Sequence, residues 1–418
     1  MSLLKKIRAS ALQFAILVGT LVALLLSSFL LLTHTHRFFS YQASSLIESI
    51  QTTQERIQNT LREGFSIPEN VPNSSYESTQ LATTAWGGFM QLRAATTSHN
   101  KTFTKSALIG HAKSESPLAL HQGDAELPLV VVGNARIVGS SLLSDKGIKA
   151  GVISGTYYNG EQLYWGQIET HEGGLPDLHE EWKQQLQGYL NFIPSAHTEF
   201  GTIEKSHSNS FHAPLLVSYN SEAARLTEKY TGHLLIWSSD TITVMPQAQL
   251  RDVMIVAPHI KIEAGFSGNA HFVSSQSIDV GSGSHLKYPS SLVVWNEFQE
   301  PTDSSQEQGP NIQLHENVTF EGTIIQLWEG QGPTQNTSSQ IKVDPGVQIS
   351  GHLYCEGNLQ LEGTVHGSVY TQRFITEAGG SRYINHLYDG QIKARQLPED
   401  FGGLPFAEST KTVVQWLY

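Results

Sequence analysis

The chain has 418 residues, a formal net charge of −12 and a single cysteine, Cys355. One thiol excludes an intrachain disulfide and any cysteine-based zinc or iron–sulfur centre, and the acidic balance argues against nucleic acid as a partner. Charged residues make up 15% of the chain, well below the usual quarter, and neutral polar residues and glycine fill the difference. This composition favours β-structure over helical bundles.

The first predicted element is a transmembrane helix over residues 9–33, which contain no ionisable side chain. About 20 apolar residues suffice to cross a hydrocarbon core of roughly 30 Å. A cleaved signal peptide is the alternative, but its apolar region would be shorter and would end at a small-residue cleavage site. Basic residues are concentrated in segment 1–8, and Arg37 alone follows the helix closely, so 1–8 is expected in the cytoplasm. The sequence thus predicts a single-pass inner-membrane protein with a periplasmic ectodomain.

Residues 40–63 are predicted to continue as a helical stalk, because Leu46, Ile50 and Ile57 fall near one face of a helix. Two interpretations of this apolar face stay open. It could pair two anchors in a short coiled coil, or it could pack against the chain's own domain. Residues 64–80 lack apolar periodicity and predict a linker.

Residues 81–230 predict a β-rich region, since short apolar runs alternate with glycine there. One helix is expected within this region, near residues 177–190, where Leu178, Trp182 and Leu186 recur at every fourth position. We expect this helix to lie against a sheet or to cover an end of a solenoid.

A period of six residues begins at Ile242 and decides the predicted fold. Every residue in the series 242, 248, 254, 260, 266, 272 and 278 is apolar, and most residues two positions later are apolar as well. An apolar-x-apolar triplet at this period describes a short strand with two inward side chains and then a turn. Three such units span 18 residues and make one coil of a triangular parallel β-solenoid. The pattern therefore predicts a mostly β ectodomain that ends in a solenoid over residues 232–372.

Polar insertions interrupt this period without destroying it. Residues 299–310 and 329–340 are rich in Glu, Gln, Ser and Pro, and the period resumes after each of them. We expect both to be loops that leave the solenoid at its corners. The less regular tail, residues 373–418, is predicted to cap one end of the solenoid, where strand edges would otherwise be unpaired.

The segment Val343-Asp344-Pro345-Gly346-Val347-Gln348-Ile349-Ser350-Gly351, with its continuation to Val369, resembles the bactofilin-type, polymer-forming β-solenoid repeat. The resemblance covers residues 310–370 and, more loosely, 234–298. It implies a solenoid that builds filaments without a nucleotide. The membrane-anchored N-terminal region, the insertions and the tail depart from that family's pattern, and a capping tail would oppose filament growth.

No motif in the chain assigns a catalytic, cofactor-binding or metal site, and the sequence predicts neither an enzyme nor a cofactor. His352 and His366 lie next to inward positions and are expected to point outward into solvent. Asp344 and Glu362 are 18 residues apart, so they could stack as a general acid/base pair on successive coils, or act only as solvated corner residues. Aromatic residues that could line a sugar-binding strip, or plug the core, are Trp237, Trp295, Trp328 and Tyr288.

These observations predict a membrane-anchored β-solenoid scaffold or interaction protein of the bacterial cell envelope, whose partners are the membrane, envelope proteins or further copies of itself. Two alternatives remain. One is a carbohydrate-binding or carbohydrate-active β-helix protein. The other is an anchored component of a secretion or surface-appendage machine.

Overall fold

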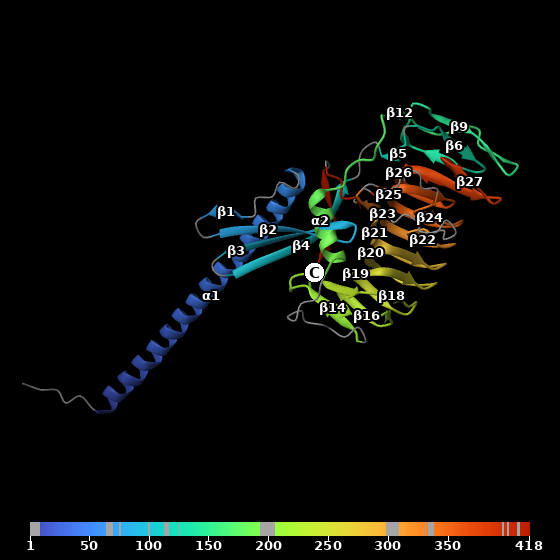
Figure 1. Cartoon of the computed structure of the whole chain (residues 1–418). Helices are drawn as coiled ribbons and strands as arrows, with labels where there is room; N and C mark the ends of the chain where they lie inside the picture. The colour runs from blue at the N-terminus through green and yellow to red at the C-terminus, as the bar shows by residue number, and fades with distance from the viewer. Residues whose placement is uncertain are drawn as a thin grey trace, which may run out of the picture.

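A computed structural model describes residues 9–63, 70–74, 77–98, 101–112, 117–124, 126–192, 205–297, 309–330, 332, 338–394, 397–398, 401–407 and 410–418. The prediction of a mostly β protein with a long N-terminal helix is confirmed. The chain forms three parts, namely the helix, an antiparallel sheet against it and a solenoid beyond the sheet (Figure 1).

Helix α1, Ala9–Glu63, is one continuous helix. Residues 11–32 are all exposed, and this part of α1 is long and apolar enough to cross a membrane. The segment 40–63 is helical as predicted, but it is not a free stalk. Its later turns pack against the sheet, where Ile57 is fully buried, so the second of the two interpretations describes this end of the helix. Leu46 remains exposed, which shows that the predicted apolar face divides between sheet and solvent.

The antiparallel sheet is assembled from both ends of the chain. Its strands are β1, Asn70–Ser74, β2, Glu77–Trp86, β3, Phe89–Ser98, β4, Lys101–Ala112, β30, Gly402–Gly403, and β31, Lys411–Leu417. β2, β3 and β4 form a meander, and both C-terminal strands pair with the far edge of β4. Buried hydroxyl groups join the helix to the sheet, because Thr96 on β3 lies 2.7 Å from Thr53 on α1 and 3.0 Å from Thr79 on β2.

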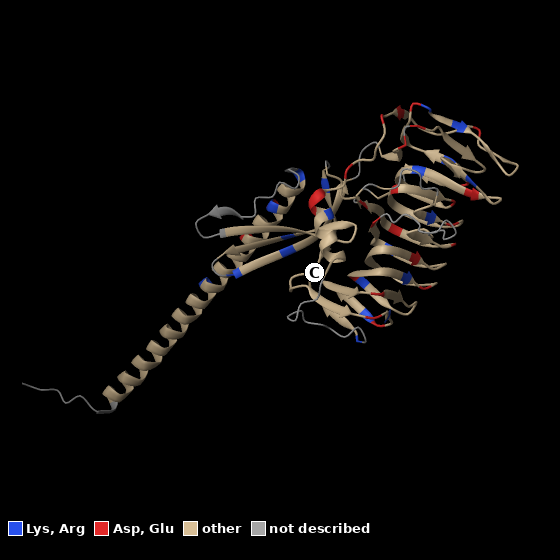
Figure 2. Cartoon of the chain, in the orientation of Figure 1, with Lys and Arg blue, Asp and Glu red and all other residues tan. Residues whose placement is uncertain are grey.

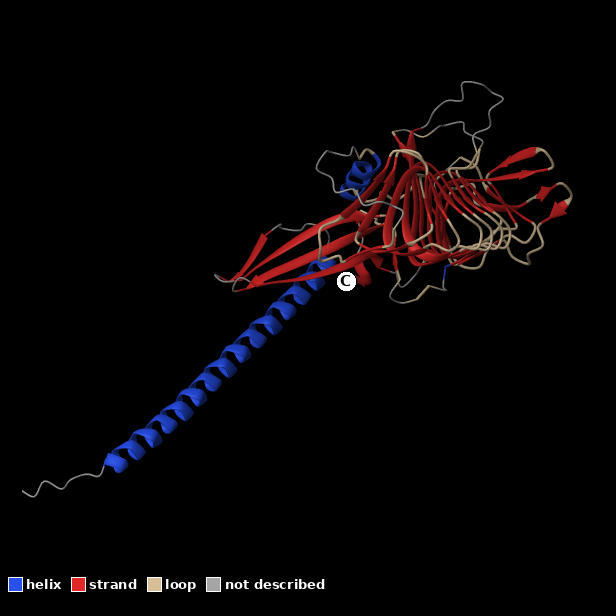
Figure 3. Cartoon of the chain, turned by 90° about the horizontal axis from the view of Figure 1, so that it is seen from below, coloured by secondary structure: helices blue, strands red, loops and turns tan. Residues whose placement is uncertain are grey.

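The solenoid is built from parallel strands that stack in register from coil to coil. The strands of its regular part are β13, His207–Asn209, β14, Leu216–Asn220, β15, Ala224–Leu226, β16, Lys229–Gly232, β17, Leu234–Ser238, β18, Thr241–Val244, β19, Gln249–Ile262, β20, Ser267–Val280, β21, His285–Glu297, β22, Ile312–Leu314, β23, Thr319–Glu329, β24, Ile341–Val343, β25, Gln348–Leu361, β26, Thr364–Ala378, and β29, Gln391–Lys393. Figure 3 looks along the axis and shows successive coils superposed.

The predicted 18-residue register is confirmed over most of the repeat. Ile242 pairs with Ile260 and Ile260 with Ile278, and all three side chains lie in one buried cluster. The next coils pair Ile278 with Ile312 and Ile312 with Ile341, so the two polar insertions lengthen the chain between coils and leave the stacking intact. Parts of both insertions, residues 298–308, 331 and 333–337, lie outside the described residues.

One stretch of the predicted grid is wrong. Met254 and Val256 were expected to point inward, but they belong to the buried cluster between the solenoid and the antiparallel sheet. The inward positions are instead Val253 and Ile255. The cause is a break in register beside Asp252, whose positive φ of 60° turns the strand over.

A column of three glycines shows how closely the coils stack. Gly322 pairs with Gly351, and Gly351 pairs with Gly367. All three have φ between 142° and 153°, which side chains with a Cβ atom rarely adopt. A Cβ atom on Gly351 would lie 1.8 Å from the carbonyl oxygen of Gly322. Glycine is therefore required at this position by both conformation and space.

The solenoid extends beyond its predicted bounds of 232–372 on both sides. It begins at β13, and β29 adds a further strand beyond β26. The predicted β-rich region 81–230 is not one unit, because it contributes to the sheet and to both ends of the solenoid. The strands that it adds beyond β26 are β5, Leu118–Gln122, β6, Leu129–Val132, β7, Arg136–Val138, β8, Ser140–Leu143, β9, Ile148–Ala150, and β12, Ile168–Thr170, while two short antiparallel strands, β10, Val152–Ile153, and β11, Thr156–Tyr157, form a hairpin there.

This extension reverses the order of the chain. β5 pairs with β26, β7 pairs with β29, and β6 pairs with β28, His386–Tyr388. Segments that come early in the sequence thus form the last coils, stacked on segments that come about 250 residues later. The short strand β27, Ser381–Ile384, folds back on β26 in an antiparallel hairpin.

The predicted capping role of residues 373–418 is wrong. Within this tail, β29 continues the solenoid, and β30 and β31 complete the antiparallel sheet. The edge of β26 is covered by β29 at Thr364–His366 and by β5 at Val369–Thr371, and residues 118–170 add the strands that follow.

Helix α2, Glu180–Leu190, confirms the predicted helix, which starts slightly later than expected. It contacts β2 of the sheet and β19 and β20 of the solenoid, so it covers a face of the solenoid rather than an end. Trp182 is fully buried there, and its indole N–H donates to the carbonyl oxygen of Gly87 at 3.0 Å. α2 thereby fixes the sheet to the solenoid.

Candidate functional site

Two of the four polar candidates do not come together as a catalytic pair. Asp344 lies 3.4 Å from a ring nitrogen of His315, whereas Glu362 accepts a 2.9 Å hydrogen bond from Gln360. The two carboxylates thus have different partners, and neither contacts a nucleophile among the described residues. The predicted stacking of the two positions is seen, since the preceding residues Val343 and Leu361 pair on adjacent coils.

The two histidine candidates differ from each other. His366 is half-buried and lies 3.1 Å from the side-chain oxygen of Gln348 on the preceding coil. His352 was expected in solvent, but it is only 6% exposed, because Phe401 and Gly403 pack against its ring. It points out of the solenoid core as predicted, and the antiparallel sheet then covers it.

Two of the four aromatic candidates, Trp237 and Tyr288, make contacts that hold parts of the fold together. Trp237 stacks on Tyr219 with ring centroids 5.1 Å apart, and its indole N–H donates to the carbonyl oxygen of Tyr189. The Tyr288 hydroxyl contacts the backbone of Gly402 and so ties β21 to the sheet. Neither residue lies beside the remaining two, Trp295 and Trp328.

Trp295 and Trp328 do come together, at a groove of about 510 Å³ on one corner of the solenoid. Trp295 lies near the end of β21, and Trp328 lies near the end of β23 on the next coil. The groove follows this corner across several coils, where polar side chains predominate. Its lining also includes His259, Gln276, Ser277, Asn296, Glu297, Asn311, Glu329 and Gln340.

Glu297 and Glu329 occupy paired positions on adjacent coils, so their carboxylates lie on the same side of the groove. Gln187 of α2 donates a 2.9 Å hydrogen bond to Glu329, which links the groove to the helix. Beneath them, burial raises the pKa of the Glu356 carboxyl, which accepts a hydrogen bond from the backbone N–H of Trp328. Indole rings beside hydroxyl, amide and carboxylate groups can bind a polyhydroxylated ligand. Within the groove, Nδ1 of His259 and Oγ of Ser277 lie 2.8 Å apart, so an imidazole and a hydroxyl are in contact there.

Metal binding has no support in the part of the chain that the structure describes, where no three His, Cys, Asp or Glu side chains gather as ligands. Cys355 points into the solenoid core, and burial raises the pKa of its thiol to about 12. It is an unreactive core residue.

A set of buried basic groups lies between the antiparallel sheet and the solenoid. Burial lowers the pKa of His271 and of His352 to about 3, with a further contribution from His111 in the second case. Burial also lowers the pKa of Lys411, on β31, to about 8. Sequence reasoning missed this set, since the histidines lie on strands far apart in the chain and no spacing connects them.

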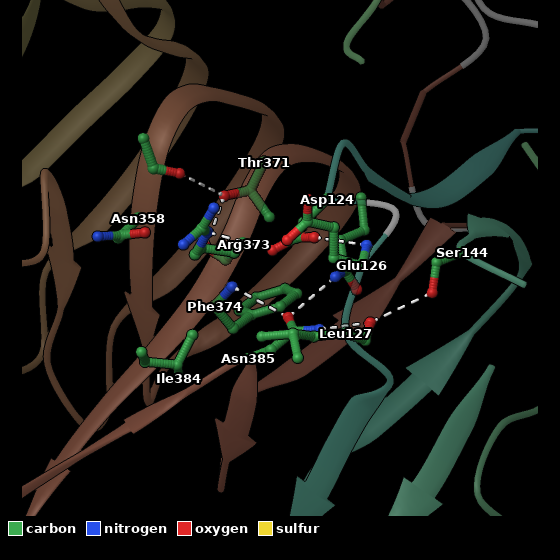
Figure 4. A network of polar contacts seen from close by, with 12 residues as sticks. Asp124, Glu126, Leu127, Ser144, Asn358, Thr371, Arg373, Phe374, Ile384 and Asn385 are labelled. Carbon is green, nitrogen blue, oxygen red and sulfur yellow. Dashed lines mark hydrogen bonds and ion pairs between the residues drawn. The ribbon is translucent and has the colours of Figure 1, made fainter. Parts of the chain in front are cut away.

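A second polar network fastens the early coils to the late ones (Figure 4). Asn385 is 1% exposed, and its amide nitrogen donates to the carbonyl oxygens of Leu127 and Pro128. Its amide oxygen accepts a 2.9 Å hydrogen bond from Gln122. Nearby, Arg373 lies 3.3 Å from the buried carboxylate of Asp124. These contacts are structural, because they satisfy backbone and side-chain groups at the point where two distant chain segments meet.

No protein-family model and no curated protein matches the chain. Among solved structures, the competence-associated pilin ComZ from Thermus thermophilus aligns with 84% of this chain and 87% of its own, at 11% identity and a TM-score of 0.21. A TM-score this low supports no argument about this chain's fold or function.

Proposed function

We propose that the chain is a single-pass, membrane-anchored scaffold of a bacterial cell envelope, with its β-solenoid held outside the cytoplasm as a surface for other envelope proteins or for further copies of itself. The proposal gives α1 the role of anchor and the solenoid the role of binding surface. The basic residues Lys5, Lys6 and Arg8 set the proposed orientation.

The observation that carries this proposal is the unbroken mechanical connection from anchor to solenoid. The exposed apolar half of α1 continues, without interruption, into helical turns that are buried against the sheet. The sheet is in turn fixed to the solenoid by α2 and by the indole N–H of Trp86, which donates to the carbonyl oxygen of Asp252 at 3.0 Å. Such a connection holds a long, rigid surface at a fixed distance from the membrane.

Association with further copies is supported by the solenoid ends. β15 pairs with β18 along one side, and no described strand pairs with its other side. Unpaired edges of this kind can add a strand from another copy. We therefore include polymer formation, as the resemblance to bactofilin-type repeats implies, in the proposal.

Two measurements test the scaffold. A reporter fused after Tyr418 should be active only outside the cytoplasm, and cytoplasmic activity would reverse the proposed orientation. Sedimentation of the detergent-solubilised chain should show larger species as concentration rises. A single monomeric species at all concentrations would exclude self-association from the proposal and leave only binding to other proteins.

Carbohydrate binding is the second candidate, and the groove around Trp295 and Trp328 is the observation that favours it. Glycan-array binding by the purified chain, lost in Trp295→Ala and retained in Trp237→Ala, would support it. Equal binding by both variants, or none by the unaltered chain, would leave the scaffold without a glycan site.

A role in an anchored secretion or surface-appendage machine is favoured by a different observation. Beyond the apolar span, α1 still exposes Leu46, Ile47 and Ile50, with exposed fractions of 50%, 55% and 38%. Apolar side chains on that flank can pack against the same helix of other copies. Disulfide cross-linking of an Ile47→Cys variant in membranes would support this role, and a lack of cross-linked product would argue against it.

A further inference from the structure

We propose that the end of the β3–β4 hairpin, together with aromatic residues of α1 beside it, docks on the phospholipid headgroup layer of the membrane. This inference rests on the proposed membrane anchoring. It adds a second contact with the membrane, made by the sheet. The surface concerned consists of Phe38, Phe39 and Tyr41 on α1 and Lys101 and Phe103 on β4, and we call it the hairpin surface.

The hairpin surface contains a mostly apolar groove of about 470 Å³ between α1 and β4. Phe38, Phe39 and Tyr41 are 52%, 67% and 59% exposed, although they follow the apolar span on the side of the antiparallel sheet. The two sides of the groove touch, because the hydroxyls of Ser45 on α1 and Ser98 on β3 lie 3.3 Å apart. The rings of Phe38 and Phe39 lie 6.0 Å apart, so exposed aromatic surface gathers beside the groove and can contact an apolar layer.

The position of these rings along α1 identifies that partner. The uncharged segment ends at Thr33, and at 1.5 Å per residue Phe38 lies about 7.5 Å and Tyr41 about 12 Å further along the axis. Aromatic residues concentrate at this depth, where the hydrocarbon core gives way to headgroups. The end of the β3–β4 hairpin at which Ser98 pairs with Lys101 points back along α1 toward the same level (Figures 1 and 3).

Charge supports a phospholipid as the occupant. Residues 33–47 and the described residues of 97–104 contain Arg37 and Lys101 and no carboxylate, in a chain whose net charge is −12. The first acidic residue along α1 is Glu48. Figure 2 shows a basic residue at this end of the hairpin and few charges along the outer half of α1. A local basic set beside exposed aromatic rings matches anionic phosphate above an apolar layer.

Contact at this surface would fix the angle between α1 and the membrane. A lone transmembrane helix can tilt and rotate, whereas a helix and a hairpin that both touch the bilayer cannot do so freely. The solenoid, which is rigidly joined to the sheet, would then keep one orientation relative to the membrane.

Site-directed spin labelling of the full chain in lipid vesicles tests the proposal. The only native thiol is buried, so introduced cysteines are labelled selectively. Thr102→Cys reports on the hairpin, Gln58→Cys on an exposed position further along α1, and Leu24→Cys on the apolar span. The measured quantity is the ratio of collision rates with oxygen and with a water-soluble nickel chelate, in vesicles of phosphatidylcholine with phosphatidylglycerol.

We expect the ratio at Thr102 to lie between those at Leu24 and Gln58. Lys101→Gln should lower the equilibrium constant for membrane contact about fivefold, the effect of one basic side chain near an anionic surface, and vesicles of phosphatidylcholine alone should lower it by at least as much. A Thr102 ratio equal to that at Gln58 would overturn the docking proposal while leaving the anchor in place. A water-like ratio at Leu24 would instead overturn the anchor itself. Strong dipolar coupling between Thr102 labels, removed by dilution with unlabelled chain, would assign the groove to a second copy and overturn the lipid proposal.

Discussion

The regular part of the solenoid and the far edge of the antiparallel sheet, where β4 meets β31, pair their strands at very different separations along the chain. In the regular solenoid the partner of Ile242 is Ile260, 18 residues later. In the sheet the partner of His111 on β4 is Lys411, near the end of the chain. A fixed short separation repeats in the sequence and can be read from it, whereas a single distant pairing leaves no periodic trace. The comparison separates what is encoded locally from what depends on the whole chain.

The largest effect is expected from a charge placed in the periodic core. Val347→Asp would bury a carboxylate without a partner, at a cost of about 4 kcal/mol or more in the free energy of unfolding. Gln348→Asp, at the adjacent exposed position, should change it by less than about 0.5 kcal/mol. Urea denaturation of the two variants measures the difference. Equal midpoints would mean that the 18-residue register does not set the core.

The glycine column gives the next largest effect. In Gly351→Ala the added Cβ atom meets a backbone carbonyl oxygen that cannot move without shifting a coil, so we expect a loss of about 3 kcal/mol. Gly188→Ala is the matched control, because Gly188 lies within α2 with nothing within 4 Å of its added Cβ atom. That substitution should stabilise the protein by about 0.5 to 1 kcal/mol. A tolerated Gly351→Ala would show that coils can separate at this column.

A smaller and localised effect is expected where early and late segments meet. Asn385→Ala removes buried hydrogen bonds to Leu127, Pro128 and Gln122, at a cost of about 2 to 3 kcal/mol. Hydrogen exchange should become faster in residues 118–170 and remain slow in residues 242–280. Uniformly faster exchange would show instead that the two ends of the solenoid unfold as one unit.

The smallest effect is expected from pH at the interface between sheet and solenoid. The pKa of His352 is about 3 in the folded chain and near 6.5 when unfolded, so the unfolded state binds more protons between these values. Stability is therefore fully present above pH 6.5 and falls as the pH drops toward 3, by up to about 2 kcal/mol per histidine at pH 5. His352→Phe should reduce this pH dependence and leave that of His271. An unchanged profile would mean that His352 becomes solvated before unfolding.

Helix α2, the triangular solenoid and its inward residues could be predicted from the sequence because each of them has a period. It failed at Met254 and Val256, where one residue with positive φ, Asp252, shifts the strand to the other face. The pattern of apolar residues cannot reveal such a shift, because both residues are still buried. They lie under the sheet instead of in the solenoid core.

The candidate site could be predicted only in part. The sequence offers Trp295 and Trp328 among four aromatic candidates, and the structure brings these two together at one groove. The hydrogen bond from Gln187 of α2 to Glu329 and the burial of His352 depend on how α2 and the sheet pack against the solenoid. That packing joins residues from distant strands, and it has no counterpart in local spacing.

The stacking of residues 118–170 on β26 has a consequence for the order in which the chain becomes structured during synthesis. Residues 118–170 leave the ribosome long before residues 364–393, which supply the strand edges that they need. The edges of β5 and β7 that pair with β26 and β29 must therefore wait until most of the chain has been made and, if exported, has crossed the membrane. β4 waits in the same way for β31. Only the middle of the molecule, with its 18-residue pairing, can grow coil by coil as it emerges, and each end then closes on the finished stack.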